Sequence, residues 1–418
     1  MRALTCILAL GCVAISWSVA SGDDELKQHN EVFHRWWGSD LELKLDKLPT
    51  QGTVAEDRMP YSGYYYPDTR GGVSNALRKY DMAFNGRRLK ATAFEQWDTT
   101  AFTEPTQVER RAGLFGRRII METTIATPSW HGHCNGWSAA TIRHSEPTKN
   151  VVQNGVTFTP ADIKALLCEL YMYTNYEELE GSSALVDAAG LHITLANWLG
   201  VKTHPIAMES DPGKEKWNFP VYGYESTVTK RGDKQVDVRT KLLYMYYSNG
   251  EYQQSPRNKR YKSFHYALNL DAEGKITNGF FYNDSARIDL LWVPLYPAKG
   301  GTKANSRGNP HIDVEAVLAL WRKSVSDDAI AHWTNIDPKG ESLLPPAPAP
   351  QIAEGANNAP VAPAAHTEPA ATPTPTPAPE QPGTASSNST TPSTTTTEGN
   401  TTPSGNGSAP STPSAPNN

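Results

Sequence analysis

Cysteine is scarce in this chain of 418 residues, which contains only four. Two of them, Cys6 and Cys12, lie in an apolar stretch that runs from residue 3 to about residue 19. Beyond that stretch only Cys134 and Cys168 remain, and two cysteines are too few for a disulfide scaffold. Stability must therefore come from a packed core, for which the ten tryptophans beyond Trp17 supply large apolar side chains.

No positively charged stop follows the apolar N-terminal stretch, and small residues precede the acidic pair that ends it. This pattern is typical of a secretory signal peptide over residues 1–20, cleaved near Ala20. A transmembrane anchor is the alternative, but the stretch is barely long enough to span a bilayer. Lipidation at Cys12 is disfavoured because the apolar run continues beyond it. We therefore expect a secreted protein, located outside the cell or in the cell wall, without a membrane span.

Lysine and arginine are absent from residues 340–418, which hold five glutamates and 17 of the chain's 32 prolines. Such a segment cannot bury enough apolar surface to offset its chain entropy. We expect a disordered Pro/Thr/Ser-rich stalk, with a bare flexible linker as the alternative. The segment's charge equals the whole-chain value of -5, so the remainder sums to about zero. That charge balance excludes a strongly basic surface for binding nucleic acid.

The body between these segments is typical of the α+β class. Residues 158–173 predict a helix, because Thr159 can cap it, Pro160 fits its first turn, and leucines and isoleucine recur at helical spacing. Alternating patterns follow at 241–248, 263–271 and 280–296, which predict strands. Helices followed by antiparallel strands indicate α+β. Residues 21–58 are read as an N-terminal extension or pro-segment, and residues 59–335 as one domain.

Cys134 lies in the stretch "SWHGHCNGWSAATIRHS", where Gly132 and Gly136 flank it and small apolar residues follow. The pattern predicts a thiol at a helix N-terminus, where the helix dipole lowers its pKa. The indole of Trp130 or Trp137 could then supply a second donor to an oxyanion.

Three interpretations of Cys134 stay open at this point: a nucleophile, a buried thiol, or a metal ligand. The metal interpretation rests on His131, His133, Cys134 and His144, but these lack the second well-spaced pair of a tetrahedral zinc site. Cys168 lies in the middle of the predicted helix at 158–173, and we expect it to be a core thiol.

Four stretches together resemble the transglutaminase elicitor family of oomycetes in order and spacing. They read "GHCNGWSAA", "NGVTFTPADIKALL", "GLHITLANWLG" and "EKWNFPVYGYE". The resemblance runs from about residue 59 to residue 321 and implies a papain/transglutaminase-like catalytic domain in a secreted enzyme that plants recognise as a defence elicitor. Phe219 and Tyr222 replace a glutamine and an arginine of the peptide that plants recognise.

The resemblance implies that Cys134 is the nucleophile and that His192 is the general base. Taken from its surroundings alone, His192 would instead be a core histidine on an apolar helix. A carboxylate should orient the imidazole. The family pattern places it at position 209, which is a glutamate here, and Asp211 follows two residues later. Asp211 is favoured over Glu209 because the longer side chain needs a shifted backbone.

The implied activity is that of a protein-glutamine γ-glutamyltransferase, which forms Gln–Lys isopeptide cross-links through a cysteine thioester. Its partners would be proteins that supply glutamine and lysine, from the cell wall or a host. The resemblance also implies calcium, for which the acidic clusters at 177–180 and 284–289 offer oxygen ligands. The alternatives are a papain-like cysteine protease or amidase, and a catalytically silent secreted protein that binds cell walls.

Overall fold

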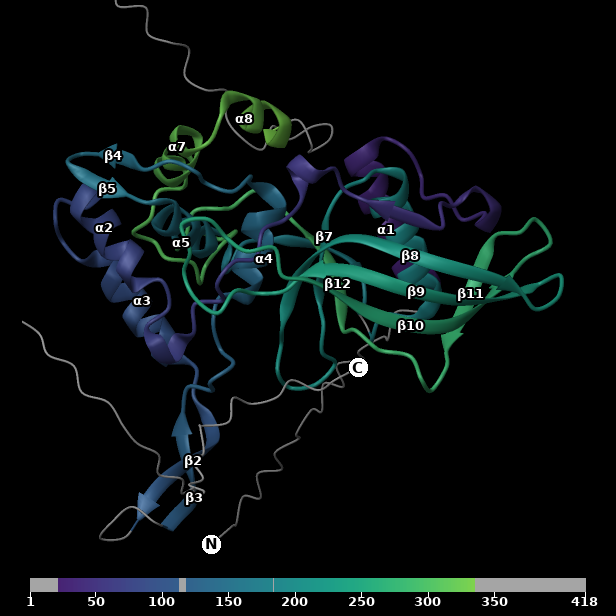
Figure 1. The fold of residues 1–418 in the computed structure, drawn as a ribbon, viewed down its shortest axis with the longest axis horizontal. Helices are drawn as coiled ribbons and strands as arrows, with labels where there is room; N and C mark the ends of the chain where they lie inside the picture. Colours follow the sequence, from purple (N-terminus) through teal and green to yellow (C-terminus); the bar gives the residue numbers. More distant parts are fainter. Residues whose placement is uncertain (1–21, 113–117, 183, 335–418) are drawn as a thin grey trace, which may run out of the picture. The chain divides into compact units, whose positions relative to one another are not determined.

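An antiparallel sheet of eight strands forms one half of the body (Figure 1). The structure is a computed structural model that describes residues 22–112, 118–182 and 184–334. The strand order is β11-β10-β9-β8-β7-β12-β6, and β1 pairs with β8. The strands are β1 (Gln51–Thr53), β6 (Tyr176–Glu180), β7 (Ile206–Glu209), β8 (Asn218–Lys230), β9 (Gln235–Met245), β10 (Lys259–Leu270), β11 (Ile276–Phe281) and β12 (Leu290–Pro294).

Helices gather beside and on the sheet: α4 lies between the strands and α2, α3 and α5, whereas α1 and α6 contact the sheet directly (Figure 1). They are α1 (Gly22–Trp37), α2 (Ser74–Phe84), α3 (Lys90–Ala101), α4 (Cys134–Arg143), α5 (Pro160–Tyr171), α6 (Ala188–Thr194), α7 (Val314–Ser324) and α8 (Asp327–Thr334). Short 3₁₀ turns η1 (Leu45–Lys47), η2 (Glu56–Arg58) and η3 (Asp68–Arg70) and a π-helical segment η4 (Leu195–Val201) complete them. The mixture of helices and antiparallel strands confirms the α+β prediction.

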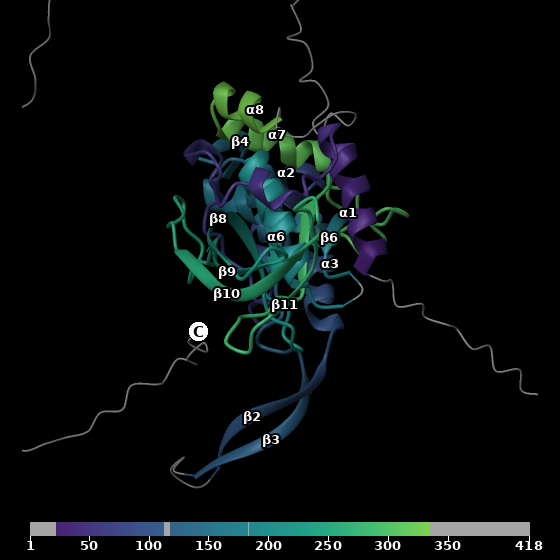
Figure 2. The ribbon, with the colours of Figure 1, turned by 90° about the vertical axis from the view of Figure 1, so that its right-hand side faces the viewer.

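Two hairpins lie outside the large sheet. The smaller one joins β4 (Val151–Gln153) to β5 (Val156–Phe158), and the larger joins β2 (Glu104–Ala112) to β3 (Arg118–Ala126). The β2–β3 hairpin projects from the body (Figure 2). No sequence pattern led us to expect it, because its strands mix charged and apolar residues without the alternation of a half-buried strand.

Helix α5 begins at the cap that its sequence predicts and ends at Tyr171, two residues before the predicted end. Thr159 caps it in a reciprocal arrangement with Asp162, and Pro160 occupies the first turn. All of its residues are buried, and not only the apolar stripe, because α2, α4 and α7 pack around it. Cys168 is 0% exposed, which confirms it as a core thiol, and its Sγ donates to the carbonyl oxygen of His133 at 3.3 Å.

A glycine allows α4 to lie directly on α5. A Cβ at Gly136 would lie 2.3 Å from the carbonyl oxygen of Cys168, so any other residue would force the helices apart. Trp137 is buried beside it, and a Cβ at Gly63 would overlap its ring. The close packing fixes the N-terminal end of α4, where Cys134 lies.

The described part of the N-terminal segment packs into the same core as the rest of the body. Val32, Phe33 and Trp36 of α1 are buried, and β1 extends the sheet through its pairing with β8. Residues 22–58 therefore contribute to the folded body. The predicted signal peptide over 1–20 and the predicted stalk over 340–418 lie outside the described residues.

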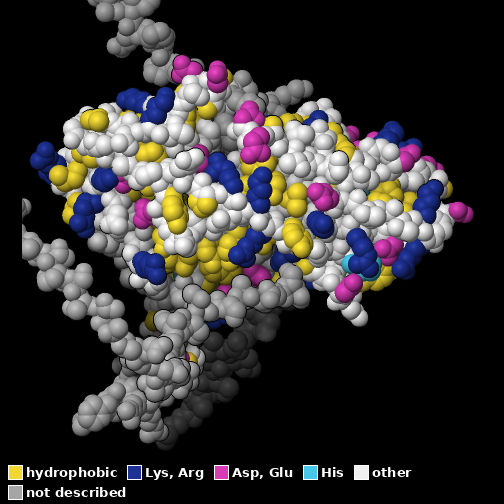
Figure 3. Space-filling view, viewed as in Figure 1, with side chains coloured by type: hydrophobic (Ala, Val, Ile, Leu, Met, Phe, Trp, Pro, Cys, Tyr) yellow, Lys and Arg dark blue, Asp and Glu magenta, His cyan; other side chains and the backbone are white. Residues whose placement is uncertain are grey.

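The predicted strands overlap β9, β10 and β12, and the stretch 280–296 includes only the last two residues of β11. Among the described residues, no helix is long and apolar enough to cross a membrane. Basic and acidic side chains are interspersed on the face drawn in Figure 3.

Glu180 at the end of β6 is a buried acid that gives the fold a pH dependence. Burial raises its pKa to about 9, with further contributions from Asp187 and Glu25. The first turn of α6 lies against this carboxyl group, because a Cβ at Gly190 would lie 2.1 Å from the Cδ of Glu180. The folded protein therefore retains a proton that the unfolded chain releases near the ordinary pKa of a glutamate.

We expect stability to fall as the pH rises from about 4.5 to about 9, since the folded state binds the extra proton throughout this window. Glu180→Gln should remove up to about 1.4 kcal/mol per pH unit of that slope. Urea unfolding of the full chain at several pH values measures it, with Glu178→Gln as the control on the same strand. Equal slopes for wild type and Glu180→Gln would contradict the assignment.

Candidate active site

Cys134 is the first residue of α4 and lies on the wall of a cavity of about 780 Å³. Its side chain is almost fully buried, with 6% exposed. The expected position at a helix N-terminus is thus confirmed. The other cavity walls come from the end of α5 and the loop after it, from β7, β8 and β12, and from a loop at 303–307.

Polar groups of the β8 segment surround the sulfur of Cys134. The thiol donates to the carbonyl oxygen of Lys216 at 3.4 Å, and the Nδ2 of Asn218 lies 3.9 Å from the sulfur. The indole Nε1 of Trp292 donates to the Oδ1 of Asn218 at 2.9 Å. Since an indole can only donate, this bond turns the Asn218 amide so that its NH₂ faces the sulfur.

The electrostatic setting of the thiol differs from the sequence expectation. Burial raises the pKa of Cys134, and the nearby Glu209 carboxylate adds to the increase. Hydrogen bonds from the backbone and side chain of Asn218 and from the backbone of Asn135 act in the opposite direction. The helix start alone therefore does not give the lowered pKa that we predicted, because removal of the thiolate from water costs more.

His192 does not lie with Cys134 in this cavity. It is buried in α6, and its Nδ1 forms a hydrogen bond with the hydroxyl of Tyr266 on β10 at 2.9 Å. Burial lowers its pKa to about 4, so the ring is neutral at pH 7. The cavity wall around Cys134 does not include His192 within the part of the chain that the structure describes. The thiol–imidazole pair implied by the family resemblance is therefore not assembled here.

The two candidate acids have different surroundings, and neither is bonded to His192 among the contacts of the described residues. Glu209 lines the Cys134 cavity, and its Oε1 accepts from the Nζ of Lys216 at 2.9 Å. Lys216 also pairs with Asp289, so the cation is shared by two carboxylates. Asp211 accepts from the hydroxyl of Ser210 at 2.6 Å. Only Glu209 of the pair faces the cavity, whereas the sequence favoured Asp211.

The two tryptophans expected to support an oxyanion lie in different places, and only one of them lines the cavity. Trp130 lines the cavity, and its ring packs edge-on against His131 at 4.2 Å between centroids. Trp137 is buried with its ring edge-on to Phe219, and its indole nitrogen does not face Cys134's cavity. Trp137 serves the core, because its position one turn into α4 points it towards the sheet.

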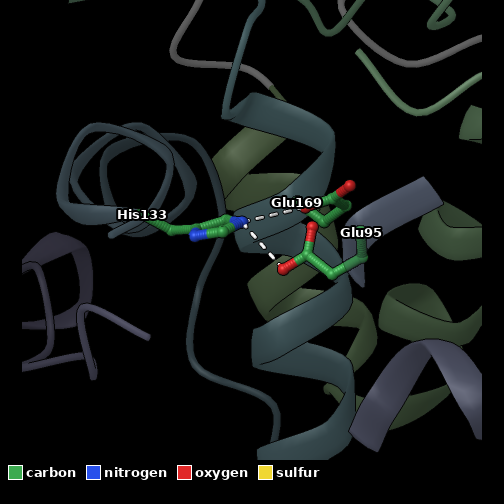
Figure 4. A group of neighbouring side chains, drawn as sticks. All are labelled: Glu95, His133 and Glu169. Carbon is green, nitrogen blue, oxygen red and sulfur yellow. Dashed lines mark hydrogen bonds and ion pairs between the residues drawn. The ribbon is translucent and has the colours of Figure 1, made fainter. Parts of the chain in front are cut away.

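The four residues of the metal interpretation do not form one site. His144 forms a hydrogen bond with the hydroxyl of Tyr171 at 2.7 Å, and His131 faces Glu104 at 3.6 Å. The ring of His133 instead faces two buried glutamates (Figure 4), and His133 is not among the residues that line Cys134's cavity. Neighbouring positions in the sequence thus point into different parts of the molecule.

The acidic clusters suggested as calcium ligands do not fit a calcium site either. Glu177 pairs with Arg35 at 2.5 Å, Asp284 pairs with His265 at 2.8 Å, and Asp289 pairs with Lys216. Calcium requires six to eight oxygen ligands around one point. These carboxylates instead have separate basic partners, so they do not converge on a common ion.

Sequence reasoning did not single out Asn218, Lys216 or Trp292 as site residues. Asn218 offers one signal, since it is a polar residue that opens the otherwise buried run of β8. Lys216 and Trp292 offer none, because both contact the site only after β8 and β12 join the same sheet around β7.

We expect iodoacetamide to label Cys134 faster than Cys168, since Cys134 borders the cavity of about 780 Å³, whereas Cys168 is 0% exposed and borders only a space of about 10 Å³. Labelling of Cys134 should accelerate up to and beyond pH 9, because its pKa is raised above the ordinary value of 9.0. Mass spectrometry of tryptic peptides after timed labelling of the full chain measures both rates.

Asn218→Ala should move this pH profile to higher pH, because it removes a donor that stabilises the thiolate. Cys134→Ser is the control that leaves only the slow label at Cys168. Equal labelling of the two cysteines would rule out an accessible reactive thiol at position 134.

Comparison with known proteins adds two findings. Residues 110–179, which include Cys134 and α5, match the model of the family described as transglutaminase elicitor. The fold is similar to the crystal structure of the GP42 transglutaminase from Phytophthora sojae, with a TM-score of 0.56 and 23% identity over 75% of this chain and 99% of that chain. No curated protein matches the sequence. The family match covers the segment around Cys134 and α5 whose motifs resemble the transglutaminase elicitor family, and the structural similarity shows that the fold is shared.

Proposed function

We propose that this chain is a secreted protein-glutamine γ-glutamyltransferase that uses Cys134 as its nucleophile. The observation that carries the proposal is the placement of a thiol at the start of α4 on the wall of a large cavity, with an oriented amide facing its sulfur. A thiol so placed is suited to attack on a carboxamide, and the cavity offers room for a side chain of a protein substrate.

In the first step the Cys134 sulfur attacks the carboxamide carbon of a glutamine. The developing oxyanion needs donors that are already in place. The Nδ2 of Asn218, held by Trp292, and the backbone N–H of Asn135 support this role, in place of the tryptophans that the sequence suggested. Collapse of the intermediate releases ammonia and leaves a thioester, which a lysine amine opens to form the isopeptide bond.

The proton from the thiol needs an acceptor that can return it to the departing ammonia. We assign this role to His131 in place of His192, because His131 lines the same cavity as Cys134. Burial lowers the pKa of His131, so its neutral ring can accept a proton, and the carboxylate of Glu104, which also pairs with Lys214, lies 3.6 Å from its Nε2. The distances between catalytic groups in a substrate-free enzyme shorten when the substrate binds.

A catalytically silent binding protein is the second candidate. The thiol of Cys134 donates to the backbone carbonyl of Lys216, and burial raises its pKa. Both features suit a cavity that binds a protein segment without reacting with it. In this case the elicitor role would reside in surface recognition, and Cys134 would only line the cavity.

The test is incorporation of a fluorescent primary amine into a glutamine-donor protein by the full chain, with and without calcium. We expect incorporation by wild type and its loss in Cys134→Ser, with Cys168→Ala as the control thiol. His131→Gln should reduce the rate at least about 100-fold, the lower range for a general base. His192→Gln should retain activity, because His192 lies outside the cavity.

The other outcomes separate the alternatives. Loss of activity in His192→Gln with retention in His131→Gln would restore the base implied by the resemblance. Cleavage of the donor protein without amine incorporation would indicate a protease or amidase. Binding of the donor protein without amine incorporation or cleavage would support the catalytically silent binding protein. A rate that depends on added calcium would support calcium as an activator.

A further inference from the structure

A buried cluster of three side chains lies directly behind the candidate nucleophile. Glu95 comes from α3, His133 precedes α4, and Glu169 comes from α5. Both glutamates face the same ring nitrogen of His133 (Figure 4). The Nε2 of His133 lies 3.1 Å from the Oε2 of Glu169 and 3.3 Å from the Oε1 of Glu95. Among the described residues, no other group of three such ligand side chains converges in this way.

The charges of this cluster do not balance. Glu95 is 1% exposed, His133 is 1% exposed and Glu169 is 7% exposed, so two carboxylates share one imidazole away from water. Asp68 adds a third acid, since its Oδ1 lies 3.7 Å from the Nδ1 of His133. Neither of those two atoms has a hydrogen-bond partner. Buried carboxylates of this kind need protons or a cation to compensate them.

The two distances from the imidazole nitrogen to the carboxylate oxygens fit a bound cation. A metal ion about 2.0–2.2 Å from each of two ligand atoms holds those atoms about 3.0–3.5 Å apart in octahedral or tetrahedral geometry. The separations of 3.1 and 3.3 Å between the imidazole nitrogen and the two carboxylate oxygens lie in this range. The three ligand atoms all lie within 4.8 Å of one another, so an ion between them would be within reach of all three side chains.

Hydrogen bonds from outside the cluster hold its carboxylates in place. The backbone N–H of Val73 donates to Glu95 at 2.8 Å, and the side-chain amide of Asn309 donates to Glu169 at 3.2 Å. Such supporting donors orient the ligands of metal sites and are characteristic of them.

We propose that Glu95, His133 and Glu169 bind one divalent transition-metal ion, with zinc as the first to test. One imidazole nitrogen and two carboxylates suit Zn²⁺, Mn²⁺ or Fe²⁺, whereas calcium takes oxygen ligands only. The site thus differs from the calcium site that the family resemblance implies. The site is enclosed, so the ion acts in the structure and does not meet a substrate.

Its effect would be to fix the candidate nucleophile. The three ligands join α3, α5 and the residue that immediately precedes Cys134, so the ion would hold the start of α4 against both helices. Two hydrogen bonds already hold the backbone of His133. Its N–H donates to the carbonyl oxygen of Tyr65 at 2.6 Å, and its carbonyl oxygen accepts from the Sγ of Cys168 at 3.3 Å. This role does not depend on whether Cys134 is catalytic.

The test is elemental analysis of the purified full chain by mass spectrometry, followed by thermal unfolding before and after removal of metal with a chelator. We expect about one zinc, manganese or iron per chain, and a melting temperature that falls by at least about 5 °C in the apo protein. Added Zn²⁺ should restore it, whereas added Ca²⁺ should not.

Glu95→Gln and Glu169→Gln should each reduce the bound metal and the response to Zn²⁺, while Glu225→Gln on the exposed part of β8 should change neither. The neutral amides keep the shape of the glutamates, so folding of these variants is expected. A wild-type chain without bound metal whose melting temperature ignores Zn²⁺ would overturn the proposal and leave a protonated His133 between the glutamates. Because metal content is the readout, this result is independent of amine incorporation.

Discussion

The contact between α4 and α5 is the constraint on which the site depends. It requires a glycine at position 136, because the backbone of Cys168 lies where a Cβ would be. Through this contact the thiol of Cys168 bonds to the backbone of His133, and the chain turns so that His133 points into the core while Cys134 points into the cavity. Two adjacent residues are thereby committed to two separate environments.

The two sides of this turn differ in the charge that must be stabilised away from water. On the cavity side the thiol is removed from water, and amide donors from Asn218 and Asn135 offset part of the cost of its ionised form. On the core side two glutamates are removed from water with a single imidazole between them. The first arrangement favours a reaction partner that enters the cavity, and the second favours a bound cation.

The sequence resemblance agrees with the family-model match over residues 110–179, but the site that it implies is not the one that the structure assembles. Its motif identified Cys134 as the residue at the helix start, and the family-model match and the similar fold agree with it. The carry-over of His192 does not correspond to the geometry, since Tyr266 of β10 holds that ring in the core. A histidine on an apolar helix can be either a general base or a buried core residue, and a motif alone does not distinguish the two roles.

Local signals in the sequence determined the start of α5, the helix start at Cys134 and the α+β class, because caps, glycines and periodicity act between residues only a few positions apart. Only the tertiary structure decided that Asn218, Lys216 and Trp292 surround the sulfur, since β8 and β12 meet there through sheet pairing. It likewise brought Glu95 and Glu169 to His133 from two other helices. Such neighbours are set by packing between distant segments, which no spacing along the chain specifies.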